Sequence, residues 1–269
     1  MTKEIIAITN DKGGVGKTTT AQNLAMGLIL KGYKVLVIDA DPQRNISSCY
    51  GWDSKREKAG EHTLFTAMTD KSDLPVYKSE RGVYYTPSSE FMTSIDPFLN
   101  THLSPNMVLS DIFKRPFENN TNDEITSISD IDYVFIDCPP SLGLTTLNAM
   151  AAATGLIIPA QLEAFSIRGL GNITAKFTDV KRSLNPHLTI RGFLQVMADE
   201  RLRSSKVYSQ GLQKSFTDLV FKTKIRRNIK LSEAQDSSSD IFEYAPESAG
   251  AKDYMLFTEE FLETSPIKE

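Results

Sequence analysis

A glycine-rich stretch near the start of the chain has the residue types and spacing of a phosphate-binding loop. It reads Lys12-Gly13-Gly14-Val15-Gly16-Lys17-Thr18-Thr19. Such a loop needs glycines where a Cβ would collide with phosphate, a lysine to neutralise the β- and γ-phosphates, and a hydroxyl that reaches a bound Mg²⁺. Lys17 and Thr18 meet these needs, although Asp11 stands where the common pattern has its first glycine. We therefore expect nucleotide phosphates to bind this loop.

Two other segments carry aspartates that fit the same chemistry. Asp39 and Asp41 follow a run of apolar residues, and Asp137 follows another run farther along the chain. In doubly wound α/β folds the carboxyl ends of the strands border the nucleotide crevice, so we expect the three carboxylates to approach Mg²⁺ and the γ-phosphate. Each aspartate alone is also typical of a turn or a helix cap. Together with the loop, they favour phosphoryl transfer.

The elements that must position these residues alternate along the chain. The apolar run 4–10 predicts a strand before the loop, and the pattern through Leu30 predicts a helix after it, which Gly32 ends. Further strands are predicted at 34–38, 132–137, 155–160, 189–197, 221–225 and 241–244, and further helices at 144–153, 166–184, 204–220 and 247–262. Continuous apolar strands between helices indicate a doubly wound α/β fold, with helices on both faces of a mostly parallel sheet. The segment 47–130 is the least regular, and 119–124 is typical of a solvated loop.

The length of 269 residues predicts one α/β domain spanning 1–269. The phosphate-binding loop begins by Asp11, which predicts that there is no N-terminal helix-turn-helix domain and no site-specific operator binding. No apolar stretch is long enough to cross a bilayer and no signal segment precedes the loop, so we expect a cytoplasmic protein. Two cysteines in neither CxxC nor zinc-ligand spacing argue against a disulfide framework or a structural metal. We assign no role to the three histidines.

The net charge of −4 hides an uneven distribution. Residues 164–230 hold 14 Lys/Arg and 4 Asp/Glu, whereas the segments before and after them carry net charges of −6 and −8. A basic block between acidic ones suits a polyanion, and phosphate contacts give DNA binding that is salt-sensitive and indifferent to sequence. The candidate DNA contacts are Arg201, Arg203, Lys206, Lys222, Lys224, Arg226 and Lys230. The alternative is that these side chains only form solvated faces.

Five motifs, taken in order, carry a family resemblance. They are the KGGVGKTT loop with its additional Lys12, IDADPQ at 38–43, FIDCPPSLG at 135–143, RNIKLSEA at 227–234 and EYAPESAGAKDY at 243–254. Together they resemble the ParA/Soj-type DNA partition ATPases, which belong to the deviant Walker A branch of the P-loop NTPases, the ParA/MinD group. The matching motifs run from Ile5 to about Leu262.

The resemblance implies a P-loop NTPase core that binds ATP and Mg²⁺. Lys17 and Thr18 would hold the phosphates and the metal, Asp39 and Asp137 would support the metal, and Asp41 would position the attacking water. The nucleotide contacts implied for the loop are Lys12, Gly13, Gly14, Val15, Gly16, Lys17, Thr18 and Thr19. The catalytic set implied in this way is Lys12, Lys17 and Asp41.

The resemblance also implies a nucleotide-controlled homodimer. Lys12 would reach the phosphates of the partner subunit in an ATP sandwich dimer, and Arg227 with Asn228 would border the adenine. Members of the family bind double-stranded DNA non-specifically in the ATP dimer, and a ParB-like centromere-binding protein stimulates their otherwise slow hydrolysis. We therefore expect an ATP-dependent partition ATPase that works on the nucleoid.

The sequence departs from the family pattern in places, and rival classes exist on the same core. Arg226 stands where a proline usually precedes the Arg-Asn pair, and Asp11 replaces a Gln or Asn. A MinD-like protein would end in a basic amphipathic helix, whereas the tail from Glu259 is acidic and predicts no membrane partner. The nitrogenase-iron-protein branch needs a pair of cluster-ligating cysteines that this chain lacks. Alternatives left open are a positioning ATPase that acts on a membrane or protein surface and a metabolic ligase.

Overall fold

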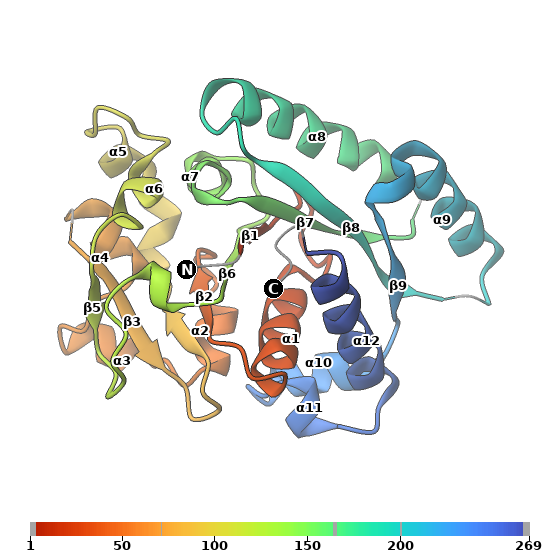
Figure 1. Ribbon diagram of the computed structural model, residues 1–269, viewed down its shortest axis with the longest axis horizontal. Coiled ribbons are helices and arrows are strands. Elements are labelled where there is room, and N and C mark those ends of the chain that lie inside the picture. Colours follow the sequence, from red (N-terminus) through yellow and green to blue (C-terminus); the bar gives the residue numbers. More distant parts are fainter. Residues whose placement is uncertain (1–3, 71, 164–165, 200, 266–269) are drawn as a thin grey trace.

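The computed structural model describes residues 4–70, 72–163, 166–199 and 201–265, with the backbone alone described at 166–169. These residues form a nine-stranded sheet in the order β5-β3-β4-β2-β6-β1-β7-β8-β9 (Figure 1). Its parallel strands are β1 (Glu4–Ile8), β2 (Val35–Asp39), β6 (Tyr133–Asp137), β7 (Gly155–Gln161), β8 (Thr189–Ala198) and β9 (Val220–Arg226). The predicted mostly parallel sheet is confirmed.

Helices cover both faces of this sheet, as predicted (Figure 1). One face carries α1 (Lys17–Leu30), α10 (Ile229–Asp236), α11 (Ile241–Tyr244) and α12 (Ala249–Glu263). The other carries α7 (Leu144–Ala152), α8 (Ser166–Ser183) and α9 (Arg203–Phe216). The predicted helix 204–220 ends earlier than expected, because a 3₁₀ turn at Thr217–Leu219 leads directly into β9.

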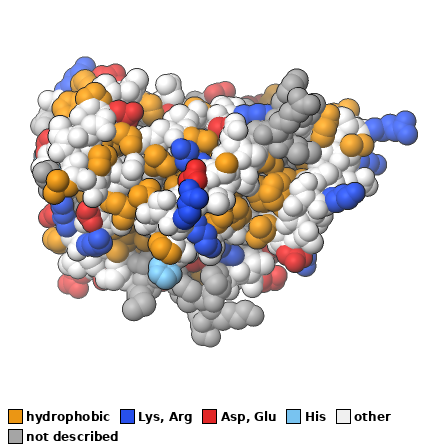
Figure 2. Space-filling view, turned by 90° about the horizontal axis from the view of Figure 1, so that it is seen from above, with side chains coloured by type: hydrophobic (Ala, Val, Ile, Leu, Met, Phe, Trp, Pro, Cys, Tyr) orange, Lys and Arg blue, Asp and Glu red, His pale blue; other side chains and the backbone are white. Residues whose placement is uncertain are grey.

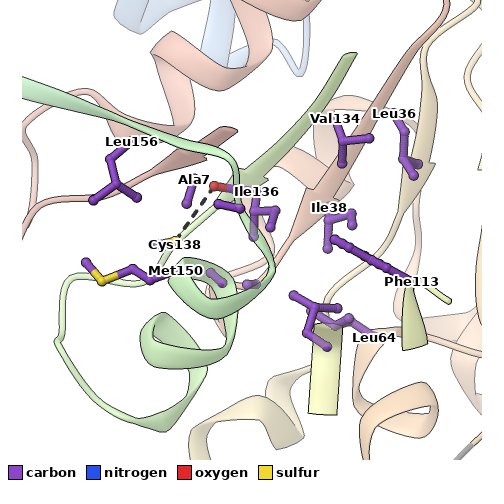
Figure 3. Packing of buried hydrophobic residues seen from close by; sticks show 14 of the residues in the cluster. Ala7, Leu36, Ile38, Leu64, Phe113, Val134, Ile136, Cys138, Met150 and Leu156 are labelled. Carbon is purple, nitrogen blue, oxygen red and sulfur yellow. Dashed lines mark hydrogen bonds between the residues drawn. The ribbon is translucent and has the colours of Figure 1, made fainter. Parts of the chain in front are cut away.

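Successive residues of the central strands point into two separate hydrophobic cores. One core, seen in Figure 3, takes Ala7, Leu36, Ile38, Val134, Ile136 and Leu156. The opposite core takes Ile6, Ile8, Val35, Val37, Phe135 and Ile157. Because both faces are buried, the interior positions of these strands are apolar, and this is why they read as continuous apolar runs in the sequence, with charged residues only at strand ends such as Glu4, Asp39 and Asp137.

The segment 241–244 is helical, and the strand predicted there is wrong. The Asp240 carboxylate accepts hydrogen bonds from the backbone N–H groups of Phe242 and Glu243, which caps the first turn of α11. The backbone N–H of Ile241 donates to Asn23 Oδ1 on α1, and the Ile241 side chain is fully buried. Four residues are too few for an apolar pattern to separate a strand from one helical turn.

The irregular segment 47–130 extends the sheet beyond β2. Here β4 (Tyr84–Thr86) runs parallel to β2, β3 (Leu74–Lys78) runs antiparallel to β4, and β5 (Phe117–Asn119) runs parallel to β3. The short helices are α2 (Asn45–Cys49), α3 (Ser54–Lys58), α4 (Leu64–Thr69), α5 (Asp96–Leu99) and α6 (Val108–Ile112), with 3₁₀ turns at Glu90–Ser94 and Ile128–Asp130. The loop 119–124 is largely exposed, as predicted, and the Asn119 amide holds it by donating to two backbone carbonyls.

Candidate functional site

The glycine-rich loop connects β1 to α1, the place that the sequence predicted. Gly14 and Gly16 have φ angles of +70° and +74°, a left-handed conformation that side chains other than glycine rarely adopt. Gly16 is also the N-cap of α1, and no side chain caps the helix there. The first backbone N–H groups of α1 therefore lack an intrahelical or side-chain acceptor, which makes this helix start a binding site for an anion.

Lys17 brings a buried cation to this helix start. Its side chain is 6% exposed, and Nζ donates a 2.9 Å hydrogen bond to the Lys12 carbonyl oxygen. Burial lowers the pKa of Lys17, and the nearby carboxylates of Asp137 and Asp41 oppose that shift. The hydrogen bond ties the ammonium group to the loop itself, so the charge is held where a phosphate would lie.

Thr18 and two aspartates meet beside the loop. The register of the sheet places Asp39, at the end of β2, directly next to Asp137, at the end of β6. Thr18 Oγ1 donates to Asp137 Oδ2 at 2.7 Å, while Oδ1 of the same carboxylate is buried and has no hydrogen-bond partner. Asp39 accepts from the Ser47 hydroxyl (2.5 Å) and from the backbone N–H groups of Ser47 and Asp41 (2.9 and 3.1 Å).

The electrostatics of this pair call for a cation. Burial raises the pKa of Asp137 well above its ordinary value, and the neighbouring Asp39 adds to the shift. Burial likewise raises the pKa of Asp39 to about 7. A divalent cation would offset the cost of burying the two carboxylates and would give the unpaired Oδ1 of Asp137 a partner. These residues therefore fit Mg²⁺. Among the described residues, no group of three or more His, Cys, Asp or Glu side chains could hold a metal by itself.

Asp41 lies near Lys17 of the loop, where its carboxylate opposes the lowering of the Lys17 pKa. Asp41 is 8% exposed, and its Oδ1 accepts a 2.9 Å hydrogen bond from the backbone N–H of Gln43.

Two asparagines that sequence reasoning missed support the loop. The side-chain Oδ1 of Asn10 accepts a hydrogen bond from the Lys12 backbone N–H, and the Asn172 amide on α8 donates to the Asp11 carboxylate. Asn10 directly follows the strand that leads into the loop, and this position was the only available signal.

A pocket of about 370 Å³ opens beside the phosphate loop. The residues expected to border adenine, Arg227 and Asn228, line it together with Gly16 and Thr19 of the loop. Sequence reasoning missed its other walls, which are Val196, Met197, Ile225, Arg226, Ile229, Leu231, Ser232, Gln235 and Tyr254. Met197 could have been anticipated, because the strand predicted at 189–197 ends with it at the same edge of the sheet as the loop.

The chain is similar to known proteins over nearly its whole length. The family model described as an AAA domain matches residues 3–190. The chromosome partitioning protein ParA of Caulobacter vibrioides is 32% identical, with 96% of this chain and 93% of that protein covered. The chromosome-partitioning ATPase Soj of Thermus thermophilus is 33% identical, with 96% and 94% covered.

The chain belongs to the ParA/Soj family of P-loop ATPases. The fold agrees with this assignment. The solved structure of cobyrinic acid a,c-diamide synthase from Mycobacterium smegmatis, with bound ADP and magnesium, superposes on this ParA-family ATPase with a TM-score of 0.78 at 26% identity. The match covers 96% of this chain and 93% of that one. The predicted resemblance and the predicted P-loop fold are therefore confirmed.

The candidate DNA contacts of this ParA-family ATPase differ in how they are paired. Three of them form ion pairs: Arg201 with Asp199 (2.7 Å), Arg226 with Asp253 (2.6 Å) and Lys230 with Glu233 (2.7 Å). Arg203, Lys206 and Lys222 are exposed and form no ion pair within the described residues, and Lys224 is half-buried. Figure 2 shows Lys and Arg side chains projecting from the end of the molecule where α9 lies. Arg201, Lys206 and Lys224 line a second pocket of about 460 Å³.

The membrane prediction can be compared with the helices of this ParA-family ATPase. Within the described ranges, none of them combines the length and the apolar character needed to cross a bilayer. The acidic tail was predicted from Glu259 onward. Its residues up to 265 include the end of α12, and its residues 266–269 lie outside the described ranges.

Proposed function

We propose that this ParA-family ATPase is a DNA partition ATPase that uses ATP and Mg²⁺. Its ATP-bound sandwich homodimer binds double-stranded DNA without sequence preference, and a ParB-like partner stimulates an otherwise slow hydrolysis that releases it. The observation that carries the proposal is the shared edge of the sheet. β8 and β9 end there beside the phosphate loop, and Arg201, Arg203 and Arg226 lie just at these strand ends. A nucleotide-dependent change at this edge can therefore reach the basic side chains.

The phosphate loop supplies binding and charge. The glycines Gly13, Gly14 and Gly16 leave room for phosphate oxygens, the N-terminus of α1 donates backbone N–H groups, and Lys17 contributes a buried ammonium. Thr18 and Asp137, supported by Asp39, would hold Mg²⁺. When bound, the metal neutralises negative charge on the β- and γ-phosphates.

Hydrolysis needs an oriented water and a neutralised transition state rather than a covalent intermediate. Asp41 is assigned the role of positioning the attacking water. Its carboxylate is buried near Lys17, and its Oδ1 accepts a hydrogen bond from the backbone N–H of Gln43. Lys12 is assigned to the phosphates of the partner subunit on the ground of the family resemblance carried by the KGGVGKTT loop. Arg227 and Asn228 are assigned to the adenine. A lysine supplied across the interface makes ATP part of the dimer contact, which couples association to the nucleotide.

The experiment that tests the proposal measures binding to a random-sequence duplex with ATP, with ADP and without nucleotide, over a series of salt concentrations. The Asp41→Ala variant serves to hold the ATP state. We expect binding with ATP alone, a steep fall with salt, and no preference among sequences. Absence of binding in all three states, with ATP-driven dimerisation intact, would reject the DNA partner and favour a positioning ATPase on a membrane or protein surface.

A synthetase is a second candidate, because the structure with a TM-score of 0.78 is named a diamide synthase. Such an enzyme couples ATP to the reaction of a small molecule and would need no DNA. The two candidates differ in what accelerates ATP turnover. Stimulation by DNA together with a centromere-binding protein supports partition, whereas stimulation by a small carboxylic acid with an ammonia donor supports the synthetase. We propose a cytoplasmic, nucleoid-associated location for the partition function.

A further inference from the structure

Helix α12 contacts both the helix that begins at the phosphate loop and the strand that ends at the 370 Å³ pocket. It packs against α1 and against β9, and β9 leads into the turn 226–229 (Figure 1). That turn lines the pocket together with Tyr254 of α12 itself. The position of α12 therefore sets how far the pocket turn lies from the phosphate loop.

The contact between α12 and α1 is close at two places. A Cβ at Gly27 of α1 would lie 2.2 Å from Thr258 Oγ1 of α12, which leaves no room for a side chain there. One turn earlier on α12, the buried Tyr254 places its hydroxyl 3.3 Å from Thr20 Oγ1. Thr20 directly follows the phosphate loop on α1. These contacts fix α12 relative to the start of α1.

Asp253 ties the same helix to the pocket turn. It is 4% exposed, and its carboxylate accepts four hydrogen bonds from Arg226. Three come from the guanidinium, at 2.6 to 3.1 Å, and one comes from the backbone N–H, at 2.9 Å. Charge-assisted bonds of this forked kind restrict geometry strongly. Because the main chain and the side chain of Arg226 are both held, Asp253 fixes the chain where β9 ends and the turn begins.

The same face of α12 also meets the start of α10. Gly250 lies three residues before Asp253, so the two positions share a face of the helix. A Cβ at Gly250 would lie 2.9 Å from Leu231 Cγ and 3.4 Å from Asn228 Nδ2. Both of these residues line the pocket. One face of α12 therefore holds the turn at its beginning, through Asp253, and beyond its end, at Gly250.

Strand β8 holds the turn from another side. The backbone N–H of Arg227 donates to the Ala198 carbonyl oxygen at 3.0 Å. The register between β8 and β9 shifts between Gln195 and Ala198, and Met197, which lines the pocket, has a left-handed φ of +52°. Such backbone costs free energy and persists where the surrounding structure fixes it, often beside a functional site. The walls of the pocket thus have a defined shape.

We propose that Asp253 and Arg226 are positioning residues for the base of the bound nucleotide. Through α12 they hold Arg227 and Asn228 at a fixed distance from the phosphate loop, so that one nucleotide meets both. The turn is ordered when the protein folds and not when the nucleotide binds, which removes an entropic cost from binding. This inference rests on the proposed assignment of Arg227 and Asn228 to the adenine, and it is independent of DNA binding.

The test compares two ligands of the full chain, ATP and inorganic tripolyphosphate, each with Mg²⁺. Tripolyphosphate has three linked phosphates but no sugar or base. Calorimetry measures both dissociation constants in the wild type, in Asp253→Asn and in Arg226→Met, well below the Tm of each protein. Lys252→Met is the matched control, because it breaks an exposed ion pair with Glu247 (3.5 Å) at the same helix.

We expect ATP affinity to be about tenfold weaker in Asp253→Asn and Arg226→Met, and tripolyphosphate affinity to change less than about twofold. Arg226→Lys keeps the charge but lacks the planar fork, so its loss of ATP affinity should be only about threefold. Lys252→Met should bind both ligands as the wild type does. If Asp253→Asn does not fold, Arg226→Met carries the test, since that side chain is 52% exposed.

Two results would overturn the inference while leaving ATP binding by the loop intact. One is an equal loss of affinity for ATP and tripolyphosphate in the two variants, and the other is no loss for either ligand. A wild-type chain that binds ATP no more tightly than tripolyphosphate would refute the adenine assignment itself, and the inference with it. Failure to bind DNA would refute the partition function and would leave this comparison unaffected.

Discussion

The edge of the sheet that carries Lys17, Asp39 and Asp137, here called the phosphate edge, has many charged groups, and so has the basic block of α9 and β9. The two regions differ in how deeply these groups are buried. At the phosphate edge Lys17, Asp39 and Asp137 are buried, and each charged group influences the pKa of its neighbours. In the basic block Arg203, Lys206 and Lys222 are exposed to solvent. Charges inside the low-dielectric edge interact strongly and have fixed positions, whereas exposed charges act additively and are screened by salt. The first arrangement suits chemistry on one phosphate chain, and the second suits contact with a long polyanion.

Removal of the buried cation should have the largest effect. Lys17→Ala takes away the one buried ammonium of the loop and leaves the carboxylates of Asp137 and Asp41 without it. We expect ATP affinity to fall by about 100-fold or more, with hydrolysis lost in parallel. Calorimetry with ATP and Mg²⁺ measures the first effect and phosphate release the second. Lys31→Ala, at the exposed end of α1, is the matched control. If that variant lost as much ATP affinity as Lys17→Ala, the loss could not be attributed to removal of the buried ammonium.

The proposed water-positioning carboxylate should affect turnover and not binding. For Asp41→Ala we expect kcat to fall by about 10²–10³-fold, while the dissociation constant of ATP changes less than about threefold. Single-turnover hydrolysis and nucleotide titration separate the two quantities. Asp218→Ala, in an exposed 3₁₀ turn, serves as the control. If ATP affinity falls as far as kcat, Asp41 holds the nucleotide and has no separate role in hydrolysis.

Changes in the basic block should be smaller and should depend on salt. The double change Arg203→Ala and Lys206→Ala removes two exposed cations that form no ion pair within the described residues. We expect about tenfold weaker DNA binding at low salt and a slope of log affinity against log salt that is shallower by about two. The paired residues Arg201 and Lys230, replaced together, should have a smaller effect, because each cation is already partly neutralised. A larger effect of the paired residues would contradict this ranking.

The smallest effect concerns the thiol of Cys49, the last residue of α2. Burial raises the pKa of Cys49 to about 11, so at pH 8 its thiolate is about 100-fold scarcer than that of an ordinary cysteine. A thiolate of higher pKa is more nucleophilic, which offsets part of this and leaves alkylation about tenfold slower than in the unfolded chain. Alkylation followed by mass spectrometry at pH 8 and pH 10 measures the rate, which should rise with pH. Equal rates in the native and urea-unfolded protein would show that this part of the molecule is open to solvent.

The sequence anticipated the central fold and the place of the glycine-rich loop for two reasons. Where both faces of a strand are buried, the interior residues of the strand are apolar, and a phosphate loop needs particular residues at fixed spacing. The strands that carry Asp39 and Asp137 and the loop that carries Lys17 satisfy these rules locally. The segment 47–130 does not, because its strands β3 (LPVYK), β4 (YYT) and β5 (FEN) are short and contain no continuous apolar run. The capped turn at Ile241 was missed for a different reason, since its partner Asn23 lies on α1.

By itself the sequence determined that a glycine-rich loop follows the first strand and that the strands form a mostly parallel, doubly covered sheet. It also determined that positive charge is concentrated in one block. Only the tertiary structure decided which charges are paired, as with Arg226 and Asp253, and which are exposed. It alone showed that Asp39 and Asp137, distant in sequence, lie side by side at the ends of β2 and β6. The physical reason is that burial and pairing depend on contacts between residues distant in sequence, whereas the geometry of a phosphate loop is encoded within a few consecutive residues.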